Sequence, residues 1–293
     1  MEKESIAIIG VGKVGAALGY LLRSAGYPVA AIFDRSSDAA ERGFTYTGGK
    51  VCRDAAEAAL RAETVFITTP DDHIRETCEE ITRDGFLFPG KKVIHASGAG
   101  GLDLLESARA AGAHVGSIHP IQSFADIAGA IENIPGSTFG ITTQEEIEEW
   151  AVRLVGDIGG RSFFVPEKDK PLYHAAACIA SNYLVTLMHV VEEIYRHLGI
   201  PADDALSSFW PLVRGTIRNI EKRGVSRSLT GPIARGDVGT VRQHLSVMER
   251  SMPIFSGLYR ELGILTALLG REAQVLSDEK AEEIRLLLEG GTQ

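Results

Sequence analysis

The chain has 293 residues, of which 44% are hydrophobic and 24% charged, and this average composition excludes a disordered or low-complexity protein. Its net charge of −9, without a block of basic residues, argues against nucleic acid or an anionic membrane surface as a partner. The three cysteines, Cys52, Cys78 and Cys178, lie far apart, so we expect neither a disulfide framework nor a metal site.

The first residues show no basic leader followed by the apolar segment of a signal peptide. No apolar run looks long enough to span a bilayer. We therefore expect a cytoplasmic protein, and its length suits about two domains.

The first half of the chain alternates short apolar runs with helical stretches. Apolar runs that do not alternate with polar residues are typical of strands buried on both faces of a parallel sheet. We therefore predict an α/β domain with a mostly parallel sheet over residues 1–165. The expected strands are 6–9, 29–33, 51–52, 65–68, 93–95, 115–118, 137–142 and 162–165, and the main helices between them are 13–24, 71–82 and 102–111.

After Pro166 the strand signals stop and only helical periodicity remains. An α/β half followed by an all-helical half indicates a second, all-α domain over residues 166–293. Its helices are expected at approximately 172–198, 202–223, 236–250, 253–270 and 278–289.

A G-x-G-x-x-G motif at Gly10, Gly12 and Gly15 follows the first strand directly and opens the first helix. Gly10 permits the tight turn, Gly12 lets a pyrophosphate approach the backbone, and Gly15 lets the helix meet the strand. Asp34 ends the second strand, where an acid that binds the ribose belongs. The context predicts a dinucleotide-binding Rossmann domain. The expected contacts in the loop are Gly10, Val11, Gly12, Lys13, Val14 and Gly15.

The choice between NAD and NADP stays open in the sequence. Asp34 would accept a hydrogen bond from a ribose 2′-hydroxyl and repel a 2′-phosphate, which favours NAD. Arg35, Ser36 and Ser37 follow it and could hold a 2′-phosphate, which favours NADP. Thr69 and Pro70 are expected near the nicotinamide ribose, whereas the two aspartates after them are expected only to cap their helix.

Several polar residues follow the carboxyl ends of strands, where ligands of open α/β sheets bind. His95 and Ser97 leave the fifth strand, and His119, followed by Pro120, leaves the sixth. An imidazole there could exchange the proton that accompanies hydride transfer, so we predict His119 as the general acid or base. The further catalytic candidates are Ser97, His95, Asn182 and His174.

The helical half supplies other candidates. His174, Ser181 and Asn182 share one face of its first helix at helical spacing, whereas Cys178 on that face has no cationic neighbour to make it a nucleophile. Arg235 lies in a glycine-rich loop and could bind a substrate carboxylate, or it could be a surface turn residue. Ser181 and Arg235 are therefore candidate substrate contacts. We expect no metal, because no histidine spacing fits a metal site.

These residues resemble a known family. The motifs are the run 6–15, Thr69-Pro70-Asp71, Gly116 to Pro120, Tyr173-His174-Ala-Ala-Ala, Ser181 to Leu184 and Leu229 to Asp237. They look like those of Rossmann-like proteins with a helical C-terminal domain of unknown function, which are often labelled NADP oxidoreductases. The resemblance covers nearly the whole chain. It implies the predicted fold, slightly favours NADP over NAD, and implies a homodimer through the helical domain.

More distantly, the architecture is similar to pyrroline-5-carboxylate reductase, ketopantoate reductase, the β-hydroxyacid dehydrogenases and prephenate dehydrogenase. The Gly-x-His-Pro motif of prephenate dehydrogenase resembles the segment 116–120 of this chain. The β-hydroxyacid dehydrogenases use a lysine and an asparagine on the first interdomain helix. Asn182 matches the asparagine, but Cys178 stands at the lysine position, which leaves a histidine as the proton donor.

The sequence therefore predicts an NAD(P)-dependent oxidoreductase acting on a small carbonyl, hydroxyl or imine substrate that bears a carboxylate. Two alternatives stay open: a dinucleotide-binding sensor without turnover, and a reductase that uses a deazaflavin, because deazaflavin-dependent reductases share this type of N-terminal domain.

Overall fold

A computed structural model of the chain describes residues 3–83 and 89–290. The chain divides into two compact units, Met1–Tyr183 and Leu184–Gln293. The first is an α/β unit and the second is helical, which confirms the predicted fold class.

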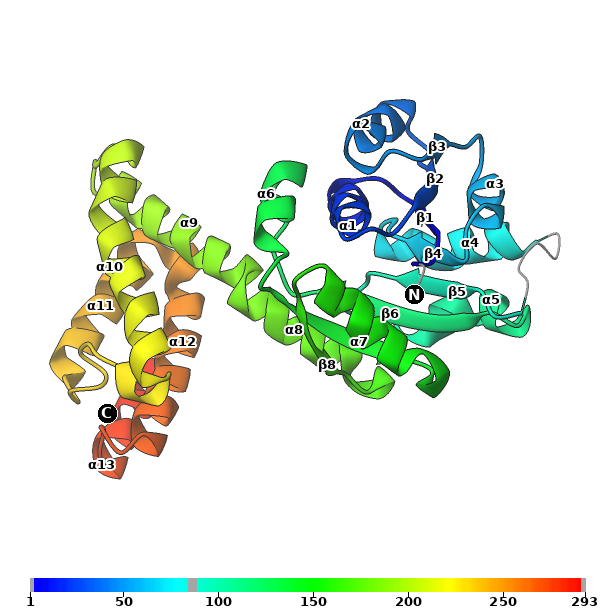
Figure 1. The fold of residues 1–293 in the computed structure, drawn as a ribbon. Helices are drawn as coiled ribbons and strands as arrows, with labels where there is room; N and C mark the ends of the chain where they lie inside the picture. The colour runs from blue at the N-terminus through cyan, green and yellow to red at the C-terminus, as the bar shows by residue number, and fades with distance from the viewer. Residues whose placement is uncertain (1–2, 84–88, 291–293) are drawn as a thin grey trace. The chain divides into compact units, whose positions relative to one another are not determined.

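The first unit contains an eight-stranded sheet with the order β3-β2-β1-β4-β5-β6-β7-β8 (Figure 1). All neighbouring strands are parallel except β6 and β7, which are antiparallel. The strand order reverses at β1, and ligands of doubly wound sheets bind at such a point. The strands are β1 (Ile6–Ile9), β2 (Val29–Phe33), β3 (Lys50–Val51), β4 (Thr64–Ile67), β5 (Lys92–His95), β6 (His114–Pro120), β7 (Thr138–Thr143) and β8 (Arg161–Phe164).

Both faces of this sheet are covered, as the unbroken apolar strands predict. Successive side chains of β1 point to opposite faces, so Ile6 and Ile8 enter one apolar cluster while Ala7 and Ile9 enter the other. The first cluster includes residues of α1 (Lys13–Ser24), α6 (Ile127–Asn133) and α7 (Glu148–Asp157). The second includes residues of α3 (Ala55–Leu60), α4 (Asp71–Thr82) and α5 (Glu106–Ala110). The remaining helix before β3 is α2 (Ser37–Thr47).

The predicted helix over 172–198 is two helices, α8 (Lys170–Ala180) and α9 (Asn182–His197), which are interrupted at Ser181. The later helices agree with the predicted ranges. They are α10 (Ala202–Arg223), α11 (Val238–Ser251), α12 (Pro253–Glu272) and α13 (Asp278–Leu288). Residues of α11, α12 and α13 form the apolar core of the second unit, whereas no residue of α9 is buried.

The boundary between the compact units lies between Tyr183 and Leu184, beyond the boundary expected near residue 165. The difference arises because α8 bonds to the sheet. Its first residue, Lys170, donates hydrogen bonds to groups on the segments that follow β5 and form β6, and Tyr173 contacts His119 at the end of β6. Helix α8 therefore belongs with the sheet, although its sequence reads like the helical half.

One helical stretch in the described part of the chain, Glu167–His197, is long and apolar enough by length and composition to cross a membrane. This corrects the expectation that no run reaches that length. None of its most apolar window is buried within the chain. The same length and composition are found in helices whose apolar side chains are covered by another protein surface, so the stretch is weak evidence for a membrane span.

Candidate functional site

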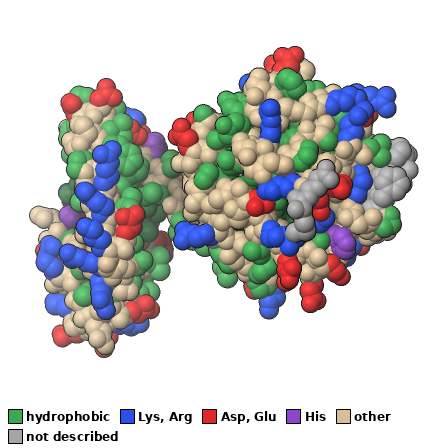
Figure 2. All heavy atoms as spheres, viewed as in Figure 1, with side chains coloured by type: hydrophobic (Ala, Val, Ile, Leu, Met, Phe, Trp, Pro, Cys, Tyr) green, Lys and Arg blue, Asp and Glu red, His purple; other side chains and the backbone are tan. Residues whose placement is uncertain are grey.

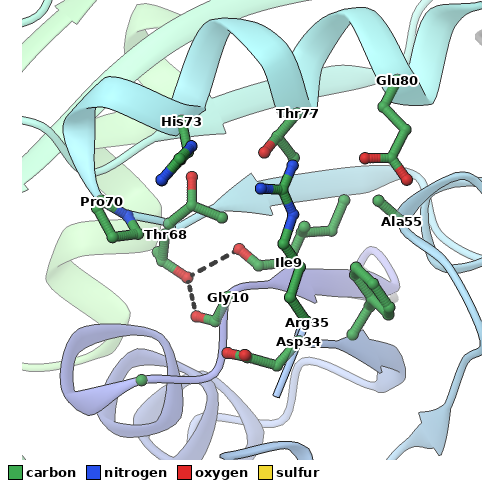
Figure 3. A pocket seen from close by; sticks show the side chains of 13 residues that line it. Ile9, Gly10, Asp34, Arg35, Ala55, Thr68, Pro70, His73, Thr77 and Glu80 are labelled. Atoms are coloured by element: carbon green, nitrogen blue, oxygen red, sulfur yellow. Dashed lines mark hydrogen bonds between the residues drawn. The ribbon is translucent and has the colours of Figure 1, made fainter. Parts of the chain in front are cut away.

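The glycine motif forms a tight turn between β1 and α1. Gly10 has a φ of 93°, and a β-carbon on it would lie 2.7 Å from the backbone nitrogen of Thr69, so only glycine fits. The hydroxyl of Thr68 donates a 2.6 Å hydrogen bond to the Gly10 carbonyl and thereby joins this turn to the end of β4 (Figure 3). At Gly12, by contrast, a β-carbon would meet no atom within 4 Å. The loop is thus closely packed on its sheet side and open at Gly12.

A cavity of about 330 Å³ lies beside this loop, at the carboxyl ends of β1, β2 and β4 (Figure 3). Six of the predicted cofactor contacts line it, and α4 forms its other wall. The lining residues are Ile9, Gly10, Gly12, Phe33, Asp34, Arg35, Ala55, Thr68, Thr69, Pro70, His73, Thr77 and Glu80.

Asp34 and Arg35 make local contacts at the edge of this cavity. The carboxylate of Asp34 accepts a 3.0 Å hydrogen bond from the backbone N–H of Ser36. Arg35 forms a 3.0 Å ion pair with Glu76 on α4, and this pair, together with His73, lowers the pKa of the Glu76 carboxyl group. The cavity edge therefore holds both an acid suited to a ribose hydroxyl and a cation that already has an acidic partner.

The other predicted cofactor residues lie around the cavity without lining it. Val11 is buried in the core, and Gly15 packs against the Gly10 carbonyl. Lys13 lines a separate hollow with Gly12 and Arg42. Ser36 caps α2 by accepting a hydrogen bond from the backbone N–H of Ala39, and Val14 and Ser37 lie in the first turns of α1 and α2.

The residues present fit a dinucleotide. The hydroxyl of Thr69 is buried at the cavity wall without a hydrogen-bond partner, and Gly12 leaves open space beside the first turn of α1. A helix N-terminus supplies backbone N–H groups and a positive dipole for a pyrophosphate. The loop and cavity could therefore hold NAD or NADP, with the phosphates at Gly12 and a ribose at Asp34.

His95, the first strand-end candidate, is fully buried, and both of its ring nitrogens face the backbone. Nδ1 accepts a 3.1 Å hydrogen bond from the backbone N–H of Ser97, so Nε2 carries the proton and donates it to the Gly101 carbonyl 3.1 Å away. Desolvation by burial, with a smaller contribution from Lys170, lowers the pKa of His95 to about 4. This geometry favours a structural role for His95 over the predicted catalytic one.

Ser97 holds the loop that follows β5. Its hydroxyl donates a 2.6 Å hydrogen bond to the Asp71 carboxylate and accepts one of 2.9 Å from the backbone N–H of Gly100. This corrects the expectation that Asp71 only caps α4, because the cap residue is Pro70 and the Asp71 side chain instead reaches the neighbouring strand end. No local spacing pattern links these two residues, which lie 26 residues apart in the chain.

His119 lies at the end of β6 among aromatic residues of α8. Its Nδ1 is 2.7 Å from the Tyr173 hydroxyl, and its ring meets that of His174 edge to face at 5.7 Å. A β-carbon on Gly98 would lie 2.9 Å from His119 Nε2, so only a glycine lets the imidazole approach the backbone this closely. The structure thus brings together two predicted residues, His119 and His174, with Tyr173, which sequence reasoning did not single out as a site residue.

The electrostatic surroundings of His119 and Tyr173 favour the neutral form of both side chains. Burial, the neighbouring His174 and the charge of Lys170 lower the pKa of His119 to about 4. Burial raises the pKa of Tyr173 to about 12. The Nδ1 atom of His174 is buried without a hydrogen-bond partner. Near pH 7 the imidazole of His119 and the phenol of Tyr173 are therefore neutral, and both can donate or accept hydrogen bonds.

Lys170 is the site residue that sequence reasoning missed entirely. Its side chain is only 1% exposed, and its ammonium donates hydrogen bonds to the Ser97 carbonyl at 3.1 Å and to the Ser117 hydroxyl at 2.8 Å. From sequence alone, a lysine followed by proline at the start of a helix is predicted to be exposed to solvent. The only available signal was its place one turn before Tyr173 and His174 on the same helix.

The remaining predicted residues lie elsewhere. Ser181 ends α8, and Asn182 is the exposed first residue of α9. Arg235 is exposed in the second unit, in the loop before Asp237, which caps α11. Their contacts with a substrate stay predictions. Among residues 3–83 and 89–290 there is no group of three or more His, Cys, Asp or Glu side chains arranged to hold a metal ion.

Comparisons with known proteins agree with this architecture. The chain carries a Rossmann-like domain at residues 2–120 and the domain of unknown function DUF2520 at residues 137–266. No curated protein sequence matches the chain.

Solved structures resemble the chain over nearly its whole length. Protein TM1727 from Thermotoga maritima is 26% identical, with a TM-score of 0.71 and coverage of 92% of this chain and 99% of that one. A pyrroline carboxylate reductase from Plasmodium falciparum with NADP bound is 13% identical, with a TM-score of 0.60 and full coverage of both chains. An imine reductase from Myxococcus stipitatus in complex with NADP⁺ is 17% identical, with a TM-score of 0.63 and coverage of 92% and 94%. These likenesses show a shared fold.

Proposed function

We propose that this protein is an NAD(P)-dependent oxidoreductase that transfers a hydride between the nicotinamide and a small carbonyl, hydroxyl or imine substrate. The observation that carries the proposal is the cavity beside Gly12, which combines an open glycine loop, Asp34 and the unpartnered hydroxyl of Thr69. The NADP-bound reductases of the same fold support it.

The loop and cavity hold the cofactor in this proposal. The backbone N–H groups at the start of α1 bind the pyrophosphate, and Asp34 and Arg35 face the adenosine ribose. Thr69 and Pro70, at the start of α4, lie against the nicotinamide half. When bound, the cofactor supplies or accepts the hydride, and the protein supplies the proton and the orientation.

His119 is the residue that we propose exchanges the proton. The Tyr173 hydroxyl can donate to Nδ1, and the ring then carries its proton on Nε2, the nitrogen on the side of Gly98. A neutral imidazole in that tautomer can donate a hydrogen bond to a substrate oxygen or nitrogen. Ser97, His174 and Asn182 complete the site, and Ser181 contacts a carboxylate-bearing substrate.

We also propose that the chain forms a homodimer through its helical part. Large apolar side chains are solvent-exposed there, including Val185 (69%), Leu212 (71%) and Ile254 (83%), and Figure 2 shows hydrophobic side chains on the surface of the chain. Monomeric soluble proteins rarely leave such surfaces uncovered. A second copy is the occupant that the family resemblance implies, and a dimer would cover α9 without a membrane.

The oligomeric state has its own test. Light scattering coupled to size-exclusion chromatography should give twice the mass of the chain, and Val185→Glu should shift it toward the monomer while Lys168→Glu, on an exposed turn, should not. A monomeric wild type would contradict the dimer. Flotation with neutral phosphatidylcholine vesicles distinguishes the membrane alternative, because we expect a cytoplasmic protein that stays unbound.

Turnover is tested by following NADH and NADPH oxidation with a panel of keto acids and imines, and reduction of NAD⁺ and NADP⁺ with hydroxy acids. Turnover with any member, lost in His119→Asn, supports the proposal. Tight dinucleotide binding by calorimetry without turnover on any substrate would favour the sensor. Binding of a deazaflavin in preference to both nicotinamide cofactors would favour the deazaflavin reductase.

A further inference from the structure

Lys170 joins three elements of the first unit beneath the His119 cluster. It is the first residue of α8, and its ammonium reaches the Ser97 carbonyl, after β5, and the Ser117 hydroxyl, on β6. The Ser117 hydroxyl donates a 3.0 Å hydrogen bond to the same Ser97 carbonyl. One backbone carbonyl thus accepts hydrogen bonds from both side chains.

The charge of Lys170 is buried without an ionic partner. No carboxylate in the described part of the chain lies within ion-pair distance of its ammonium, and both acceptors are neutral oxygens. Removing an ammonium from water is costly unless it is paired, and an apolar side chain could fill the same volume. A buried cation kept at this cost suggests a role beyond packing.

The peptide group that accepts the hydrogen bond from Lys170 joins Ser97 to Gly98, and the rings of the candidate site pack on it. Ser97 precedes Gly98, and a β-carbon on Gly98 would lie 2.8 Å from His119 Cε1 and would also collide with His174 Nδ1. The two rings therefore pack directly on the Gly98 backbone. A displacement of the Ser97 carbonyl would move the surface on which both rings rest.

We infer that Lys170 is a positioning residue of the candidate site, which fixes the Ser97–Gly98 peptide beneath His119 and His174 and holds a positive charge there. The effect of Lys170 on turnover rests on the proposed function, whereas its effect on the positions of His119 and His174 does not.

The charges around Lys170 agree with this role. Burial lowers the pKa of Lys170 to about 8, while Asp71 on α4 and Glu167 just before α8 act in the opposite direction, so the ammonium is mostly protonated at pH 7. In turn, its charge adds to burial in lowering the pKa of both His119 and His95, and His174 adds to the effect on His119. Lys170 thus helps to keep His119 neutral.

The test compares Lys170→Met, which keeps the length of the side chain without its charge, with Lys170→Arg and with the control Lys168→Met on the exposed preceding turn. The readout is the titration of the His119 ring by NMR, assigned with His119→Asn. In Lys170→Met the His119 midpoint should rise by about half a pH unit or more, because a nearby positive charge is lost. Lys170→Arg should stay near the wild type, and the control should not move.

Two further measurements distinguish a positioning role of Lys170 from a general effect on the stability of the fold. The dinucleotide Kd measured by calorimetry should change less than twofold in Lys170→Met, because the cavity is built from other residues, while the backbone amide resonance of Gly98 should shift. If Lys170→Met does not fold, Ser117→Ala, which removes one acceptor and keeps the charge, should still shift the Gly98 resonance.

A folded Lys170→Met with an unchanged His119 midpoint and an unchanged Gly98 resonance would overturn the inference, as would an unchanged Gly98 resonance in Ser117→Ala. A wild type without turnover on any substrate would count against the proposed function alone, since neither resonance depends on turnover.

Discussion

The Tyr173 hydroxyl lies 2.7 Å from Nδ1 of His119, and the two rings meet edge to face at 5.6 Å with an interplanar angle of 89°. This contact joins α8 to the end of β6 and sets the orientation of the imidazole. It also decides which nitrogen of His119 is available, because Nδ1 is engaged and Nε2 is left beside Gly98.

Removing the Tyr173 hydroxyl should therefore reduce turnover without affecting the cofactor site. We expect Tyr173→Phe to lower kcat by about 3- to 10-fold, the size of one hydrogen bond. Calorimetry should show an unchanged dinucleotide Kd. The second unit offers a matched control in the same kind of pair, in which His244 Nδ1 lies 3.0 Å from the Tyr259 hydroxyl. Tyr259→Phe should leave kcat unchanged, and equal losses in both variants would refute the positioning of His119 by Tyr173.

Replacing His119 should reduce turnover more than replacing Tyr173. We expect His119→Asn to keep cofactor binding and to cut turnover by about 10²–10⁴, the usual effect of losing an acid or base group. Steady-state kinetics on the substrate found in the panel would measure the loss, and circular dichroism would check the fold. Full activity in a folded variant would remove His119 from the chemistry, and a variant that unfolds would indicate a packing role.

Gly12→Val should abolish dinucleotide binding, because the added side chain would occupy the open space where we place the pyrophosphate. The free energy of unfolding should change little, since a β-carbon there meets no atom within 4 Å. Gly156→Val on α7 is the control, because its β-carbon position is equally open but lies away from the cavity. Unchanged affinity of Gly12→Val in calorimetry would contradict the location of the site.

Replacing Arg35 should weaken the binding of NADP and not that of NAD. If it binds the 2′-phosphate, Arg35→Ala should weaken NADP binding by about 1.5–3 kcal/mol, the value of a hydrogen bond to a charged group. The guanidinium of Arg35 is ion-paired with Glu76 in this structure. Glu76→Gln should therefore strengthen NADP binding and leave the affinity for NAD unchanged. Calorimetric titrations with both cofactors measure the two effects. Equal losses for NAD and NADP in Arg35→Ala would show that Arg35 acts on the structure instead.

His95 makes stability depend on pH in the acid range. Its pKa is about 4 in the folded chain and about 6.5 when unfolded, so the unfolded state binds the proton first as the pH falls. The free energy of unfolding should therefore decrease between pH 6.5 and pH 4, with a contribution from His95 of up to about 3 kcal/mol. Urea unfolding of the wild type and of His95→Gln across this range should show a shallower decrease in the variant. Parallel curves would contradict the burial of an uncharged His95.

The sequence alone predicted the features that depend on neighbouring residues. The strands of the sheet, the turn at Gly10 and the position of Asp34 follow from periodicity and from glycine chemistry, both of which act over a few residues. The antiparallel pairing of β6 with β7 and helix α6 were not predicted, because strand direction depends on the path of the chain between strands.

Only the tertiary structure decided which side chains meet at the candidate site. Ser97 lies 26 residues from Asp71 and 73 from Lys170, and His119 lies 54 from Tyr173, so no local pattern links them. The burial of Lys170 could not be read from its sequence either. An isolated lysine is most stable in water, and it is buried here only because the Ser97 carbonyl and the Ser117 hydroxyl accept its hydrogen bonds once the sheet and α8 have come together.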